Sequence, residues 1–124
     1  MTMPLLGITG IRQAGPRTLF NVAANINVLL YDQIAGRSAI VRKVSWRNAQ
    51  GVQVTLRIGT GVAGAAGIVD LVPNILCPAN LAGDIAEVDL PGLETQANQD
   101  IVGQIDAISA NNFEAEAEVE VIGA

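Results

Sequence analysis

The chain has 124 residues, of which half are apolar but only 3% are aromatic, and its formal net charge is −5. This length predicts one domain, with a core of Val, Ile, Leu and Ala that folds without metals or disulfides. Charged residues make up 15%, against about 25% in ordinary soluble domains, so we expect other subunits to cover part of the surface. With no His and a single Cys, the sequence excludes a Ser-His-Asp triad and argues against a zinc site.

The first residues lack the features of a secretory signal or a membrane anchor, so neither is expected. No apolar run is long enough to span a membrane, and the first ten residues lack the basic region of a secretory signal. Synthesis in the cytoplasm is therefore expected. Residues 1–17 hold three Gly and two Pro without a sustained period, which predicts an extended N-terminal arm that is ordered against a partner. Residues 18–124 are expected to form the folded domain.

Most of the chain alternates apolar and polar residues with the period of β-strands. Residues 18–31 predict one bulged strand or two short ones, and residues 68–82 predict a short edge strand and a turn of helix. Further strands are expected at 38–47, 52–58, 85–90, 101–108 and 113–122, with tight turns at 48–51 and 110–112. This pattern predicts an all-β, single-domain antiparallel β-sandwich. A jelly roll is the favoured form, and an immunoglobulin-like topology remains open.

A glycine-rich segment follows the strand at 52–58. Residues 59–67 match G-x-G-x-x-G, and Asp84 lies twenty residues beyond Gly64, as in a dinucleotide-binding fingerprint. That site needs a full helix after the glycines, and Pro73 and Pro78 interrupt the segment where the helix should run. We therefore interpret residues 59–67 as a loop of small residues and expect no nucleotide cofactor.

The charges are divided along the chain. All seven basic residues and one acid lie in the first 57 positions, and the other eleven acids follow, so the two parts carry +6 and −11. One interpretation is that the two parts pair within one sandwich. The other is that the basic strands of one copy meet the acidic strands of a neighbour. The acidic balance and the few aromatic residues argue against nucleic-acid binding.

The last predicted strand carries four alternate glutamates on one face. Like charges at this spacing repel each other and suit a general acid/base pair poorly, so we predict that the protein is not an enzyme. The ladder is either a solvated face that discourages aggregation or the partner of basic residues on a neighbouring strand or subunit. For the second case we predict an interface that contains Arg12, Arg17, Arg42, Lys43, Arg47, Arg57, Glu114, Glu116, Glu118 and Glu120.

Two segments resemble small head decoration (cement) proteins of tailed phages. They are GRSAIVRKVSWRNAQGVQVTLRIGTG at 36–61 and FEAEAEVEVIGA at 113–124. The resemblance implies a homotrimer on the exterior of an icosahedral virion. There it would clamp neighbouring subunits of the major capsid protein without a cofactor, a small-molecule substrate or a membrane. The alternative is a receptor- or carbohydrate-binding β-sandwich of a phage tail or fibre, although the few aromatic residues argue against sugar stacking.

Overall fold

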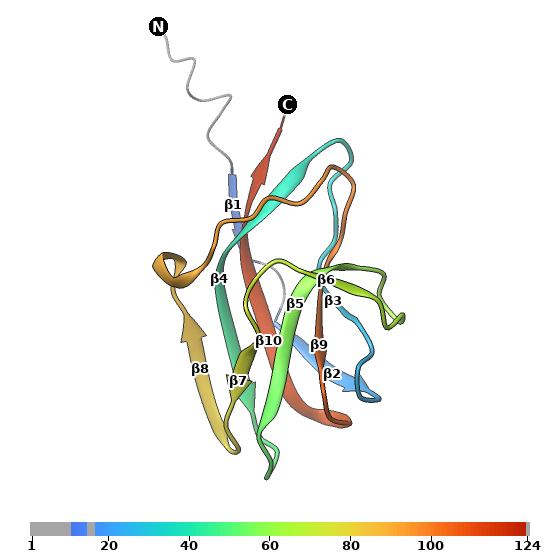
Figure 1. Cartoon of the computed structure of the whole chain (residues 1–124), viewed down its shortest axis with the longest axis vertical. Coiled ribbons are helices and arrows are strands. Elements are labelled where there is room, and N and C mark those ends of the chain that lie inside the picture. Colours follow the sequence, from blue (N-terminus) through green and yellow to red (C-terminus); the bar gives the residue numbers. More distant parts are fainter. Residues whose placement is uncertain (1–10, 15–16, 124) are drawn as a thin grey trace, which may run out of the picture.

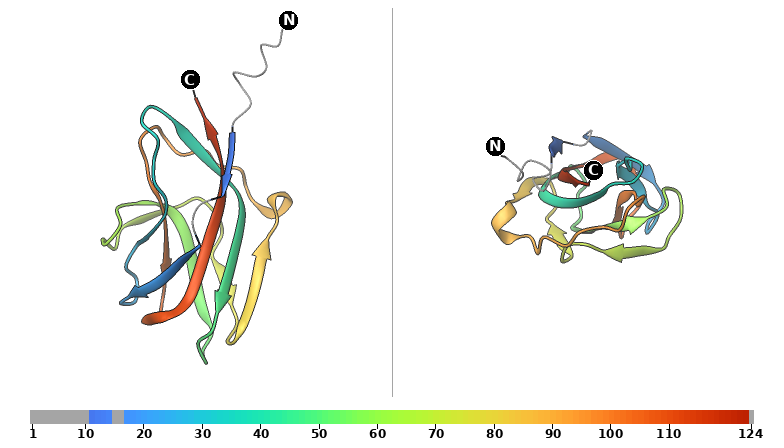
Figure 2. Two further views of the ribbon diagram at one scale, coloured as in Figure 1. Left: turned by 180° about the vertical axis from the view of Figure 1, so that it is seen from behind. Right: turned by 90° about the horizontal axis from the view of Figure 1, so that it is seen from above.

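The computed structural model describes residues 11–14 and 17–123, and these residues form two antiparallel five-stranded sheets that pack on each other. Figure 1 shows the arrangement, and the view from above in Figure 2 shows the sheets as two layers. The predicted all-β sandwich is confirmed. Of the predicted N-terminal arm, residues 11–14 form a strand of the first sheet, whereas residues 1–10 and 15–16 lie outside the described residues. The division at residue 17 stays a prediction.

The first sheet is built around its longest strand, β10 (Ser109–Ile122). On one side β10 pairs with β4 (Ser38–Asn48), which in turn pairs with β8 (Leu81–Ile85). On the other side, β2 (Thr18–Val22) and β1 (Ile11–Ala14) pair with successive parts of β10. The last strand of the sequence, β10, is therefore the central strand of this sheet and pairs with the early strands β1, β2 and β4.

The second sheet has β5 (Val54–Gly61) and β9 (Ile101–Ile105) at its centre. The strand β3 (Val28–Tyr31) pairs with β9 at one edge. At the other edge, β6 (Ile68–Asp70) and β7 (Ile75–Cys77) pair with successive parts of β5. Both sheets thus have one edge that is divided into two short strands.

Two of the predicted turns are wrong, although the strands beside them exist. The chain leaves β4 and enters β5 in the other sheet, so residues 49–53 cross the sandwich. The chain also crosses between β9 and β10, and Asn111, at φ 64°, lies in an irregularity inside β10 and not in a hairpin turn. Alternation reports only which face of a strand is buried. Because both sheets bury one face, the pattern is the same for a hairpin partner and for a strand across the core.

A second correction concerns residues 68–90. The expected turn of helix within 68–82 is absent, since this segment supplies β6, β7 and the start of β8. The expected strand at 85–90 is also wrong, because β8 ends at Ile85 and a 3₁₀ helix (Glu87–Asp89) follows. Val88 is 87% exposed in that helix. Beyond the end of β8, the backbone of β4 pairs at Ile40 with Glu94. Tertiary pairing thus overrides the local alternation of residues 85–90.

The core joins the inner faces of the two sheets. From β10 it receives five side chains that are at most 3% exposed, which confirms the predicted inward face: Phe113, Ala115, Ala117, Val119 and Val121. The ring of Phe113 meets that of Phe20 edge to face, with centroids 5.2 Å apart. Trp46 lies directly on the backbone of β8, since a Cβ at Gly83 would come 2.6 Å from its Cζ2. Small residues thus make room for the few aromatic rings.

Candidate functional site

The outer face of the first sheet carries the glutamate ladder that the sequence predicted. Along β10, Glu114, Glu116, Glu118 and Glu120 alternate with the buried residues and point away from the core. The strand β4 and the β1–β2 edge flank β10 on both sides, so their basic side chains lie beside the ladder. We call this surface the charged face.

Each glutamate of the charged face is paired with an arginine of the same chain. Arg17 contacts two of them, with Nε 3.1 Å from Glu114 Oε1 and Nη1 3.0 Å from Glu116 Oε1. Arg12 Nη1 lies 3.2 Å from Glu118 Oε1, and Arg42 Nε lies 2.9 Å from Glu120 Oε1. The like charges on β10 are therefore compensated within the sheet.

A bulge in β4 aims Arg42 at its partner. Lys43 pairs in register with Glu118 and Val41 with Val119, so Arg42 is the extra residue between them. The bulge also exchanges the inward and outward positions of the strand, so that both Val41 and Val44 point into the core although they are three residues apart. The regular alternation expected for this strand is interrupted for that reason.

The remaining predicted interface residues are arranged less tightly. Arg47 is 57% exposed, and its Nη1 is 3.9 Å from Glu114. Lys43 is exposed and makes no ion pair with any residue that the structure describes. Arg57 lies on the other sheet, where its Nε is 3.1 Å from Asp70 Oδ1. The structure thus brings nine of the ten predicted residues to one face and places Arg57 elsewhere.

The ion pairs among the described residues all join a basic residue of the first 57 positions to a later acid. The structure thus contains the pairing within one sandwich that the first interpretation expected, and the pairing between neighbouring copies stays a prediction. Most of these side chains are partly exposed, and solvent screening leaves such pairs little effect on stability. Their role is to fix strand register more than to stabilise the fold.

Comparisons with protein-family models, with curated proteins and with solved structures found no match. The surfaces of this chain must therefore be interpreted from their own chemistry.

The only cysteine is not placed for nucleophilic chemistry. Cys77 points into the core from β7, and burial raises the pKa of its thiol to about 12, so the reactive thiolate is scarce near neutral pH. No group of three metal-ligating side chains occurs among the described residues. Within the same residues, no helix is long and apolar enough to cross a membrane.

The glycine-rich segment is part of a sheet and its connecting loop. Gly59 and Gly61 belong to β5, and the chain continues through residues 62–67 into β6 without a helix. A Cβ at Gly59 would lie 2.0 Å from the carbonyl oxygen of Val69, and one at Gly61 would lie 2.6 Å from that of Gly67. These glycines permit close backbone packing, which explains the motif without a nucleotide.

Residues 62–67 are tied down by a buried polar network that the sequence analysis did not find. The amide of Asn27 donates to the carbonyl oxygens of Val62 at 3.1 Å and Gly67 at 2.7 Å. Gln104 donates to Asn27 Oδ1 at 2.8 Å and to the Ala66 carbonyl at 2.9 Å. The loop is thereby held to residues next to β3 and on β9. Asn27 and Gln104 are 77 positions apart, so no local pattern could have joined them.

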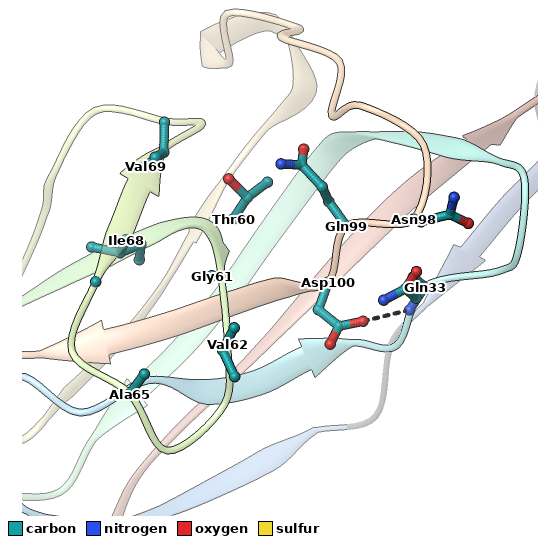
Figure 3. A pocket seen from close by; sticks show the side chains of 11 residues that line it. Gln33, Thr60, Gly61, Val62, Ala65, Ile68, Val69, Asn98, Gln99 and Asp100 are labelled. Atoms are coloured by element: carbon teal, nitrogen blue, oxygen red, sulfur yellow. Dashed lines mark hydrogen bonds between the residues drawn. The ribbon is translucent and has the colours of Figure 1, made fainter.

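A groove of about 690 Å³ opens beside this loop (Figure 3). The β5–β6 loop and β6 form one wall, and residues 98–100 with Gln33 form the other. Its lining combines apolar and amide side chains with one carboxylate, and the sequence analysis did not predict it. The lining comprises Gln33, Thr60, Gly61, Val62, Ala65, Gly67, Ile68, Val69, Asn98, Gln99 and Asp100.

A second, apolar hollow of about 260 Å³ lies where β7, β8 and the 3₁₀ helix meet. Its apolar lining comes from Val72, Pro73, Ile75, Leu76, Ile85 and Leu90. Within this lining Leu76 is 61% exposed, and Val88, which precedes the lining residue Asp89 in the chain, is the most exposed large apolar side chain among the described residues. We call Leu76, Val88 and this lining the apolar edge.

Proposed function

We propose that this protein is a structural virion protein that stabilises an icosahedral phage capsid as a homotrimer. It docks non-covalently on the capsid exterior, across neighbouring subunits of the major capsid protein. The observation that carries this proposal is the apolar edge, because an apolar hollow with the exposed Leu76 in its lining, and with the exposed Val88 next to its lining residue Asp89 in the chain, suits a surface that another protein covers. The resemblance of residues 36–61 and 113–124 to decoration proteins supports the same function.

The strand order supports the jelly-roll form of this proposal. When each divided edge is counted as one strand, the sandwich has two four-stranded sheets. Consecutive strands then alternate between the sheets, except that β5 and β6 form a hairpin within one sheet. This alternation agrees with two interlocked Greek keys, the arrangement that jelly rolls of viral capsid proteins use.

Charge indicates what kind of partner fits the apolar edge. The stretch from 68 to 90 contains four acids and no basic residue. Asp70 and Glu87 pair with Arg57 and Arg12, whereas Asp84 and Asp89 make no ion pair among the described residues. We therefore expect a partner surface with an apolar centre and basic side chains around it. Such a contact weakens as salt screens the rim, whereas its apolar centre is much less sensitive.

Light scattering of the purified chain tests the trimer directly, at low and high salt. We expect a mass three times that of the chain. Leu76→Asp and Val88→Asp should reduce it to that of one chain, because each places a charge in the contact. Ile108→Asp is the matched control, since Ile108 is 72% exposed on the β9–β10 connection and does not line this hollow. A monomer at all concentrations contradicts the trimer, and a trimer unaffected by both edge variants contradicts the role of the apolar edge in forming it.

Docking on the capsid is tested separately, by sedimentation with undecorated heads of the corresponding phage. The unmodified chain should sediment with the heads at a fixed ratio. Failure to bind them would overturn the proposed function even if the chain is a trimer.

A further inference from the structure

We infer that the groove of Figure 3 binds a neutral saccharide. This site is distinct from the apolar edge and does not depend on capsid docking. Its walls come from the β5–β6 loop and from residues 98–100, which the fold brings together although they are far apart in the sequence.

Both walls are fixed before any ligand arrives. The Asn27–Gln104 network holds residues 62–67 through four hydrogen bonds to their carbonyl groups or to each other. Opposite, the backbone N–H of Gly36 donates to Asn98 Oδ1 at 2.8 Å, and that of Gln33 donates to Asp100 Oδ1 at 2.9 Å. A preformed groove avoids the entropic cost of ordering loops on binding.

These internal bonds leave a set of polar groups unengaged within the described part of the chain. In Asn98 and Gln99 only the amide oxygens are used, by the N–H groups of Gly36 and Gln96, so both NH₂ groups remain as donors. The second carboxylate oxygen of Asp100 remains as an acceptor, and the side-chain amide of Gln33 offers both functions. Closely spaced donors and acceptors match vicinal hydroxyl groups, each of which both donates and accepts.

The charge of the lining selects against other small ligands. The residues that line the groove include one carboxylate and no Lys or Arg, so phosphates and other anions are repelled. A single carboxylate with one oxygen already hydrogen-bonded is a poor site for a divalent cation. A neutral polyhydroxylated ligand is the class that remains.

Apolar side chains give the groove a second means of contact. Val62 and Val69 are 69% and 70% exposed at its border, beside the less exposed Ile68. The C–H face of a pyranose ring covers such surface, while its hydroxyls reach the amides. No aromatic side chain lines the groove, so binding is expected in the millimolar range, typical of single sugar units without a stacking platform.

An NMR titration of the full ¹⁵N-labelled chain tests the site. The probes are N-acetylglucosamine, methyl α-glucoside and methyl β-galactoside, each added to roughly 50 mM to suit the expected affinity. We expect at least one sugar to cause saturable shifts confined to residues 60–69, 98–100 and Gln33. An uncharged Gly-Ser-Asn-Gly peptide with blocked ends is the competing probe.

Matched variants separate specific binding from surface effects. Gln33→Ala removes an exposed amide that makes no side-chain hydrogen bond to described residues, and it should weaken binding about fivefold, the value of one hydrogen bond. Gln53→Ala removes an exposed amide outside the groove and should leave the affinity unchanged. Ala65→Leu should fill part of the groove without adding an aromatic ring for the sugar to stack on, and it should abolish the shifts. The proposal is overturned if no sugar gives saturable shifts there, if the blocked variant responds equally, or if only the peptide binds.

Discussion

The amide of Gln104 donates to Asn27 Oδ1 at 2.8 Å, and this buried contact joins β9 to the residue that precedes β3. Asn27 uses its own NH₂ group for the carbonyl oxygens of Val62 and Gly67, and both amide side chains are at most 3% exposed. The pair therefore satisfies backbone groups of the β5–β6 loop that would otherwise be left without partners.

Asn27→Ala should destabilise the protein by about 2–3 kcal/mol, because the buried Gln104 amide and two part-buried loop carbonyls each lose a hydrogen bond. Urea denaturation measures this loss, and hydrogen exchange should show faster exchange in residues 62–67. Asn21→Ala is the control, since Asn21 is exposed on β2. Equal stability of the two variants would show that the network does not hold the loop.

Gly59→Ala should lower the free energy of unfolding by about 3 kcal/mol or prevent folding, since the new Cβ would overlap the Val69 carbonyl oxygen in the paired strand. Gly67→Ala is the matched control within the same glycine-rich segment, because a Cβ there meets no atom within 4 Å and the residue needs no positive φ. Thermal denaturation of both variants measures the difference. A destabilised Gly67→Ala with an unaffected Gly59→Ala would contradict the packing role of the motif.

Cys77 makes stability fall at alkaline pH. Its pKa is raised by burial from 9 to about 12, so the folded state holds the proton more tightly than the unfolded state. Below pH 9 both states are protonated and the thiol has no effect. Between 9 and 12 the unfolded thiol ionises first, and the free energy of unfolding falls by about 1.4 kcal/mol per pH unit.

Urea denaturation across this alkaline range measures the slope. Burial also raises the pKa of Tyr31, which adds a loss of the same sign, so Cys77→Ala is the necessary comparison. The variant should lack the contribution of the thiol and decline less steeply. Parallel curves would refute a protonated buried thiol, as would rapid reaction of folded Cys77 with a thiol reagent at pH 8.

Charge reversals at different positions of the charged face should lower the free energy of unfolding by different amounts. Lys43→Glu should destabilise by less than about 1 kcal/mol, because Lys43 is exposed and without an ion pair among the described residues. Arg42→Glu should cost more, roughly 1–2 kcal/mol, since it opposes Glu120 in the least exposed pair of the face. Adding Glu120→Arg to Arg42→Glu should restore part of the loss, which denaturation of the three proteins measures.

This difference also decides how the predicted interface is probed. A variant that reverses Arg42 changes the fold and the surface together. Lys43→Glu changes the surface alone, so its effect on assembly mass reports on contacts between chains. An unchanged mass would leave Lys43 outside any such contact.

The sequence analysis predicted the buried and exposed faces better than the partners of each strand. The inward and outward faces of β10 follow directly from strict alternation over ten residues, and the structure confirms them. The crossings at 49–53 and 106–108 could not be predicted, because a two-residue period is the same for strands paired within a sheet or opposed across the core.

The candidate sites show the same limit. Glu114 and Arg17 were selected by charge, and the fold brings them to 3.1 Å. The groove depends on Gln33 and Asn98 meeting a loop from another part of the chain, and neither residue belongs to a pattern that could be read locally. Long-range pairing creates such sites, and one sequence carries little information about it.

The central position of β10 has a consequence for how the chain acquires its structure. The first sheet lacks its central strand until residues 109–122 have left the ribosome, because β1, β2 and β4 all pair with these residues. Until then, the side of β4 that pairs with β10 has no partner strand, and unpaired strand edges of this kind favour aggregation. Folding of this sheet is dominated by pairings between residues far apart in the sequence, which makes it slow compared with that of a helical chain of equal length.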